Sequence, residues 1–153
     1  MKVFPILKTD ELPKQAKILF SVDYPMFEGD INNIILLDEY VIIWTEYTSK
    51  LTGKRKVSQL EFPKDAIQWF VNTIENNYWG NGGDKSSTSE EVVINNESIG
   101  VSSMAHCCAE NLPGYNFWNR SRKDHVSNLP PQEWDIPRYM LEEGLLEKLK
   151  RIT

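Results

Sequence analysis

With 153 residues and a net charge of −5, the chain is long enough for one sizeable hydrophobic core but too short for two comfortable ones. Apolar residues make up 41% of the chain and charged residues 25%, a composition typical of folded globular proteins and not of disordered ones. We therefore expect a single domain over residues 1–153.

We expect no export signal at the amino terminus. Its apolar run is interrupted by Pro5 and Lys8 before it reaches the length of a signal peptide. The longest apolar runs elsewhere, "IILL" and "YVIIW", are far too short to cross a bilayer. We therefore expect a cytoplasmic protein.

The first third of the chain predicts β-strands. Residues 17–24, 34–37 and 40–48 are rich in β-favouring side chains, and Asp38-Glu39 between the last two runs suggests a hairpin. Both faces of residues 40–47 are apolar over most of their length, which indicates a central strand. A glycine-containing turn then leads to a further strand over residues 57–62.

A helix follows at Pro63, a residue suited to the first helical position. Apolar residues recur at helical spacing and form one stripe, which predicts a helix packed on a sheet; its members are Ile67, Phe70, Val71, Ile74 and Tyr78. Gly80 should end this helix, and the serine-rich and glycine-rich stretch after it predicts a loop.

The rest of the chain predicts more strands and a closing helix. Residues 91–94 and 98–104 flank "NNE", a hairpin signal, and residues 115–120 supply one more strand. Pro130 and Pro131 make the following segment turn-rich, and residues 137–152 form a helix with a weak point at Gly144. The expected fold is α+β: one antiparallel sheet of about six strands, with one internal helix and one C-terminal helix packed on it.

Two adjacent cysteines, Cys107 and Cys108, cannot form a framework of loop-closing disulfides and are expected to be reduced thiols. His106 beside them raises the possibility of a zinc site or a nucleophile. However, the chain has no second pair of ligands, and neighbouring residues on a strand point to opposite faces. We expect no metal and no cofactor.

Catalytic patterns are equally sparse. His106 and His125 could act as an acid/base pair with Arg122 or Lys123, but the sequence gives neither histidine a fixed partner. Adjacent carboxylates such as Glu90-Glu91 diverge and cannot flank one substrate bond. The sequence therefore assigns no catalytic residue, and a small hydrolase or nuclease using His106 or His125 stays the alternative reading.

Charge is distributed in blocks along the chain. Residues 21–49 hold six acids and no base, and residues 65–119 hold seven acids against Lys85 alone. Such blocks repel nucleic acid and anionic membranes and attract a basic protein, although acidic residues also simply keep proteins soluble. Several of the five tryptophans lie outside clean apolar stripes, as anchors of protein interfaces do. The residues predicted to bind a partner are Glu28, Asp30, Asp38, Glu39, Glu46, Trp79, Asp84, Glu90 and Glu91.

Two stretches resemble a known class of proteins. The segment "LEFPKDAIQWFVNTIENNYWGNGG", and "LPPQEW" ahead of a terminal "GLLEKLKRI", are similar to immunity proteins of bacterial contact-dependent growth inhibition and related polymorphic toxin systems. The resemblance implies a cytoplasmic, non-enzymatic protein that binds one cognate toxin domain, often a basic nuclease, and blocks it. An adaptor with several moderate-affinity partners is a third reading.

Overall fold

The computed structural model describes residues 1–23, 30–80, 89–108 and 111–152. Within them lie eight strands: β1 (Ala16–Asp23), β2 (Ile31–Leu37), β3 (Tyr40–Thr48), β4 (Arg55–Pro63), β5 (Ser89–Ile94), β6 (Glu97–Cys107), β7 (Leu112–Asn119) and β8 (Gln132–Pro137). The helical elements are α1 (Lys64–Thr73), η1 (Ile74–Trp79), α2 (Arg138–Met140), η2 (Leu141–Leu145) and α3 (Leu146–Lys150).

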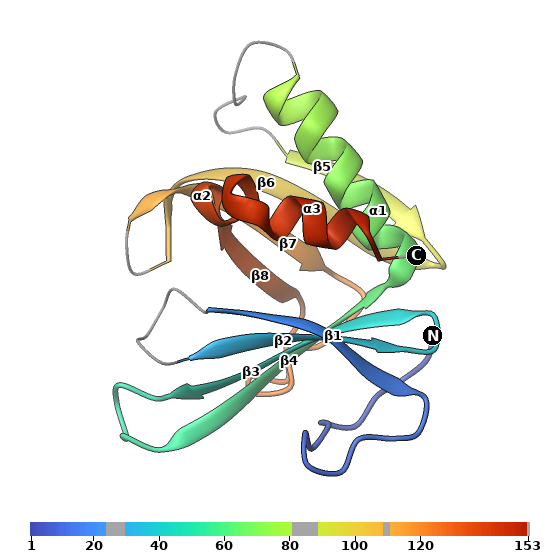
Figure 1. The fold of residues 1–153 in the computed structure, drawn as a ribbon, viewed down its shortest axis with the longest axis vertical. Helices are drawn as coiled ribbons and strands as arrows, with labels where there is room; N and C mark the ends of the chain where they lie inside the picture. The colour runs from blue at the N-terminus through green and yellow to red at the C-terminus, as the bar shows by residue number, and fades with distance from the viewer. Residues whose placement is uncertain (24–29, 81–88, 109–110, 153) are drawn as a thin grey trace.

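The strands form two antiparallel sheets of four, β1-β2-β3-β4 and β5-β6-β7-β8, and within each sheet the strands pair in sequence order. The prediction of one sheet with about six strands was therefore wrong. The helix after β4 carries the chain away from the first sheet, and β5 starts a second one (Figure 1). Strand β8 was also missed, because the two prolines that suggested only turns end immediately before Gln132, where the strand begins.

Tight turns fix the register of the predicted hairpins. Leu37 pairs with Tyr40, and Asp38 between them adopts a positive φ of 54°. Ile94 pairs with Glu97 across Asn95 and Asn96, which both have positive φ. Asparagine and aspartate tolerate this left-handed conformation better than other non-glycine residues do, so both hairpin predictions are confirmed.

The predicted internal helix is also confirmed. It begins after Pro63, continues from α1 into the wider turns of η1, and ends at Gly80. The whole predicted apolar stripe is buried. The C-terminal helix has a kink at Gly144, whose φ of 129° only glycine adopts readily, at the weak point that the sequence predicted.

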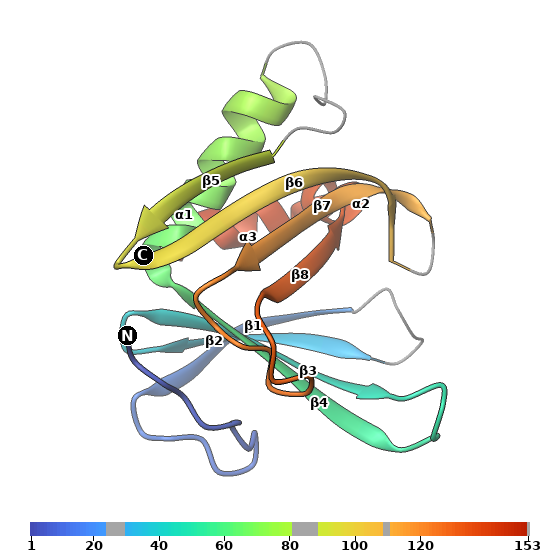
Figure 2. The same ribbon diagram turned by 180° about the vertical axis from the view of Figure 1, so that it is seen from behind.

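One continuous core joins the two sheets and the helices, with members from β2, β3, β4, α1, β6, β7, β8 and the C-terminal helix. The helices cover one face of the second sheet (Figure 1), and its other face is turned to the viewer in Figure 2. A smaller cluster lies on the opposite face of the first sheet, where Phe4 and Leu7 of the N-terminal segment pack against Ile42 and Trp44. Strand β3 is thus buried on both faces, as its sequence predicted.

Among the described residues, none of the helices has the length and apolar character needed to span a membrane.

Candidate functional site

The predicted acidic residues lie at three places, and most of them have a cationic partner. At one end of the first sheet, Asp30 is buried and its carboxylate accepts a 2.8 Å ion-paired hydrogen bond from Arg55. The same guanidinium lies 3.6 Å from Glu46, which is exposed. Asp30 therefore holds Arg55 in place and does not itself lie at the surface.

At the β2–β3 turn, Asp38 forms an ion pair with Lys2 of the N-terminal segment. Its neighbour Glu39 lies 3.3 Å from the Lys64 ammonium group at the start of α1. The Glu39 side chain is 77% exposed, so this pair is open to solvent and weak. The acidic turn thus lies beside the N-terminal segment.

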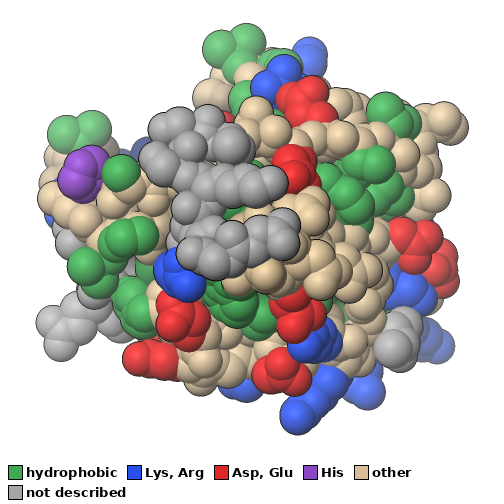
Figure 3. All heavy atoms as spheres, turned by 90° about the horizontal axis from the view of Figure 1, so that it is seen from above, with side chains coloured by type: hydrophobic (Ala, Val, Ile, Leu, Met, Phe, Trp, Pro, Cys, Tyr) green, Lys and Arg blue, Asp and Glu red, His purple; other side chains and the backbone are tan. Residues whose placement is uncertain are grey.

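The third place is the edge of the second sheet. Glu90 accepts two hydrogen bonds from the Asn77 side-chain amide, at 2.8 and 3.1 Å, and Glu91 lies 3.0 Å from Arg120. Basic side chains also lie among acidic ones elsewhere on the surface. Figure 3 shows the two kinds interleaved across one face of the molecule. The two remaining acids of the prediction, Glu28 and Asp84, lie outside the described residues.

Trp79, the predicted aromatic anchor, is half-buried at the end of η1 and packs against the core. Its indole N–H donates a 2.8 Å hydrogen bond to the Tyr115 hydroxyl, and the Arg138 guanidinium lies 5.4 Å from its ring centroid. These contacts give Trp79 a structural role in addition to any part it has in binding.

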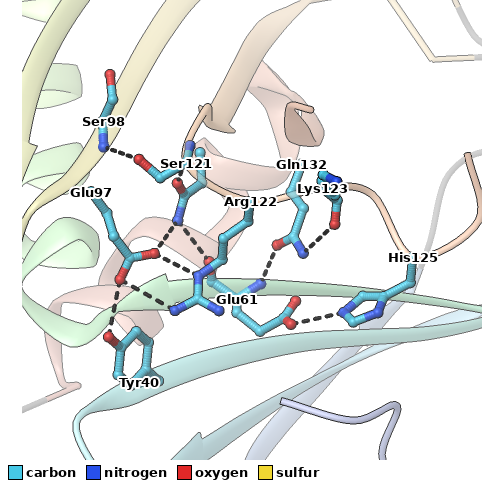
Figure 4. Close-up of polar contacts among 10 residues, drawn as sticks. Tyr40, Glu61, Glu97, Ser98, Ser121, Arg122, Lys123, His125 and Gln132 are labelled. Atoms are coloured by element: carbon cyan, nitrogen blue, oxygen red, sulfur yellow. Dashed lines mark hydrogen bonds and ion pairs between the residues drawn. The ribbon is translucent and has the colours of Figure 1, made fainter. Parts of the chain in front are cut away.

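The densest polar arrangement lies where the two sheets meet (Figure 4). Glu97, at the start of β6, is fully buried. Its carboxylate accepts hydrogen bonds from Arg122 at 2.5 and 3.3 Å, from Asn119 at 3.0 Å and from the Tyr40 hydroxyl at 3.0 Å. Since Tyr40 belongs to β3, this buried carboxylate ties the first sheet to the second.

A second buried carboxylate, Glu61 on β4, lies beside the first. Its Oε1 is 2.7 Å from Nε2 of His125, and its backbone N–H donates a 2.7 Å hydrogen bond to the Gln132 side chain. Its carbonyl accepts one from Asn119 at 3.1 Å. The other carboxylate oxygen, Oε2, is buried and has no hydrogen-bond partner among the described residues.

Glu61 and His125 line a hollow of about 340 Å³. Its remaining walls come from the N-terminal segment, the loop between β7 and β8, and the first residue of β8; they are Met1, Val3, Phe4, Ser121, Arg122, Lys123, Asp124, Asn128 and Gln132. Asp30 Oδ2 and Trp118 Nε1 are also buried without a hydrogen-bond partner among the described residues, but neither residue lines this hollow. Because an unpaired buried carboxylate oxygen is unfavourable, a ligand group that enters the hollow and donates to Glu61 would be stabilising.

The electrostatics of this region favour a neutral Tyr40. Burial, and then the hydrogen bond to the Glu97 carboxylate, raise the pKa of the Tyr40 hydroxyl above its ordinary value, although Arg122 opposes this shift. A tyrosine that stays protonated keeps donating to Glu97, which maintains the link between the sheets.

The other candidate chemistry does not converge on this hollow. His106 is exposed near a bulge in β6 and is absent from the walls of the hollow. The two cysteine sulfurs lie 3.4 Å apart, and contact with Cys108 and burial raise the pKa of Cys107, so its thiol stays protonated. In the part of the chain that the structure describes, no group of three or more His, Cys, Asp or Glu side chains could hold a metal ion.

Sequence reasoning missed Glu61 and Glu97. A signal for Glu61 was present, because an acid inside an apolar strand must find a partner when the strand is buried. Glu97 follows two turn asparagines and carries no such signal.

Comparisons with protein-family models, with curated proteins and with solved structures found no match to this chain.

Proposed function

We propose that this protein is a cytoplasmic immunity protein, without enzymatic activity, that binds and neutralises one cognate toxin domain, a basic nuclease. The observation that carries the proposal is a set of exposed apolar side chains beside the hollow. Met1 and Val3 line it and are 68% and 78% exposed. Val126 and Leu129 lie on the loop that supplies His125, and they are 60% and 66% exposed.

Exposed apolar residues gathered near a polar centre are typical of protein-binding surfaces. The Lys2–Asp38 ion pair brings the acidic β2–β3 turn next to the same N-terminal segment. We call this region the junction face, defined as Met1, Val3, Asp38, Glu39, Val126 and Leu129. Its apolar members would supply buried contact area, and Glu39 would supply attraction for a basic partner.

The proposal is tested by co-expression. If a toxin is encoded immediately upstream of this gene, cells that produce its toxic domain should grow when this protein is also produced and should die without it. A surface-exposed variant in the β3–β4 turn, Leu51→Asp, serves as the control and should protect equally, because Leu51 is 97% exposed and lies at the end of β3 opposite to Asp38 and Glu39. Failure of the wild-type protein to protect would contradict the proposal.

One contact favours the alternative, a small hydrolase or nuclease. The structure gives His125 the fixed carboxylate partner that the sequence could not supply, and a carboxylate behind a histidine orients it as a general base. Because no nucleophile among the described residues is bonded to this histidine, we expect purified protein to hydrolyse neither p-nitrophenyl acetate nor RNA faster than its His125→Ala variant does. A rate that depends on His125 would favour the enzyme over the immunity protein.

A further inference from the structure

The outer edge of β1 borders a groove. Among the described residues no strand pairs with this edge, since β1 is the first strand of its sheet. Two hollows of about 410 and 350 Å³ lie between β1 and the C-terminal helix and share Lys148. The strand lines them with Leu19, Phe20, Ser21, Val22 and Asp23, and the helix with Tyr139, Met140, Glu143, Gly144, Leu145, Lys148, Arg151 and Ile152.

The groove follows the backbone of β1, not one of its faces. Successive side chains of a strand point to opposite faces, yet Ser21, Val22 and Asp23 all line the same hollow. An unpaired strand edge presents a row of backbone N–H and C=O groups that can pair with another strand. A bulge separates Ile18 from Phe20, and from Phe20 to Asp23 the pairing with β2 is regular. The regular stretch is therefore the part that another strand can pair with, and the bulged residue Leu19 lies just beyond it, where the side chain of a fifth residue would reach.

The groove has acidic side chains at one end, a basic side chain at the other, and a lysine between them. Asp23 and Glu143 lie in the first hollow, and Arg151 lies in the second, with Lys148 common to both. None of these four side chains forms an ion pair with another described residue, and the Lys148 ammonium group lies 5.6 Å from the centroid of the Phe20 ring on β1. The strand from residue 19 to 23 advances about 13 Å at 3.3 Å per residue. The helix from residue 143 to 151 advances about 12 Å at 1.5 Å per residue. The two walls therefore match in length, and the acidic and basic ends lie about four strand residues apart.

We propose that this groove binds an extended segment of a partner protein, which joins β1 as an additional antiparallel strand and carries a basic residue four positions before an acidic one. When the added strand runs antiparallel to β1, its basic residue lies near Asp23 and Glu143, and its acidic residue lies near Lys148 and Arg151. Backbone pairing provides affinity in this mode of recognition, and the groove walls provide specificity. The groove is separate from the junction face, so the inference does not depend on toxin binding.

The test uses two labelled peptides and the full-length protein. Acetyl-Lys-Val-Thr-Val-Glu-amide should bind saturably in fluorescence anisotropy, and the charge-reversed peptide acetyl-Glu-Val-Thr-Val-Lys-amide should bind at least about tenfold more weakly. The variant with Asp23→Lys, Glu143→Lys, Lys148→Glu and Arg151→Glu should show the opposite preference. All four side chains are exposed, so circular dichroism should confirm that the variant folds.

Backbone pairing has its own readout. Methylating the alternate peptide nitrogens that face β1 should abolish binding, whereas methylating the intervening nitrogens should not, because only one set donates to the strand edge. Equal effects of the two methylation patterns, or no binding of either peptide, would overturn the proposal. A third result would also overturn it: the protein sediments as a dimer at all concentrations and binds neither peptide. In that case a second copy of the chain would occupy the strand edge.

Discussion

Arg122→Met should lower the free energy of unfolding by about 3–5 kcal/mol, because it leaves the buried Glu97 carboxylate without its charged partner. The side chains of Glu97 and Arg122 are 0% and 4% exposed, so water cannot replace the lost interaction. Urea denaturation followed by circular dichroism measures the change.

Arg120→Met is the matched control for this prediction. Arg120 also pairs with a glutamate, Glu91, but the two side chains are 60% and 47% exposed. Loss of the Arg120–Glu91 pair should therefore lower the free energy of unfolding by no more than about 1 kcal/mol. Adding Glu97→Gln to Arg122→Met should recover part of the stability, since no buried charge then remains. Equal costs for the two arginine variants would show that the buried pair stabilises the fold no more than the exposed pair does.

Phe117→Ala should lower the free energy of unfolding by about 3–5 kcal/mol, the range for removing a buried aromatic side chain. Phe117 on β7 is fully buried, and its ring centroid lies 4.2 Å from that of Phe62 on β4 and 4.5 Å from that of Phe70 on α1. This one side chain therefore connects both sheets and the internal helix.

The same experiment tests the prediction of a single domain. If the two sheets fold as one unit, tryptophan fluorescence and far-ultraviolet circular dichroism should report one shared transition, displaced to lower urea in Phe117→Ala. The exposed Val93→Ala variant should stay within about 0.5 kcal/mol of the wild-type protein. Two separated transitions in the wild-type protein would mean that the sheets are independent units.

Local signals in the sequence were sufficient for the hairpins and the helices. Turn residues such as Asp38 and Asn95 adopt the left-handed conformations that tight hairpins need, and the apolar stripe over α1 and η1 is the buried one. The division into two sheets could not be predicted in this way, because whether β5 joins an earlier strand or starts a new sheet depends on contacts between residues far apart in the chain.

The candidate site was hidden for the same reason. Glu61 and His125 are 64 residues apart, and Glu97 and Arg122 are 25 residues apart. Contacts between residues distant in sequence also change how the acidic blocks are interpreted. Between residues 21 and 49 no base appears in the sequence, yet Lys2 and Arg55 reach this block from outside it. Counting charges along the chain therefore overstates the negative field that these acids produce.

The most direct test of the proposed function is a titration of the purified protein with the toxin domain encoded upstream, by isothermal calorimetry. The wild-type protein should bind tightly, and Val3→Asp combined with Val126→Asp should weaken binding at least about tenfold, because it places charge in the apolar part of the junction face. Leu51→Asp, at the far end of β3, should bind like the wild-type protein. Equal affinities for all three proteins, or no binding of the toxin domain by the wild-type protein, would contradict the account.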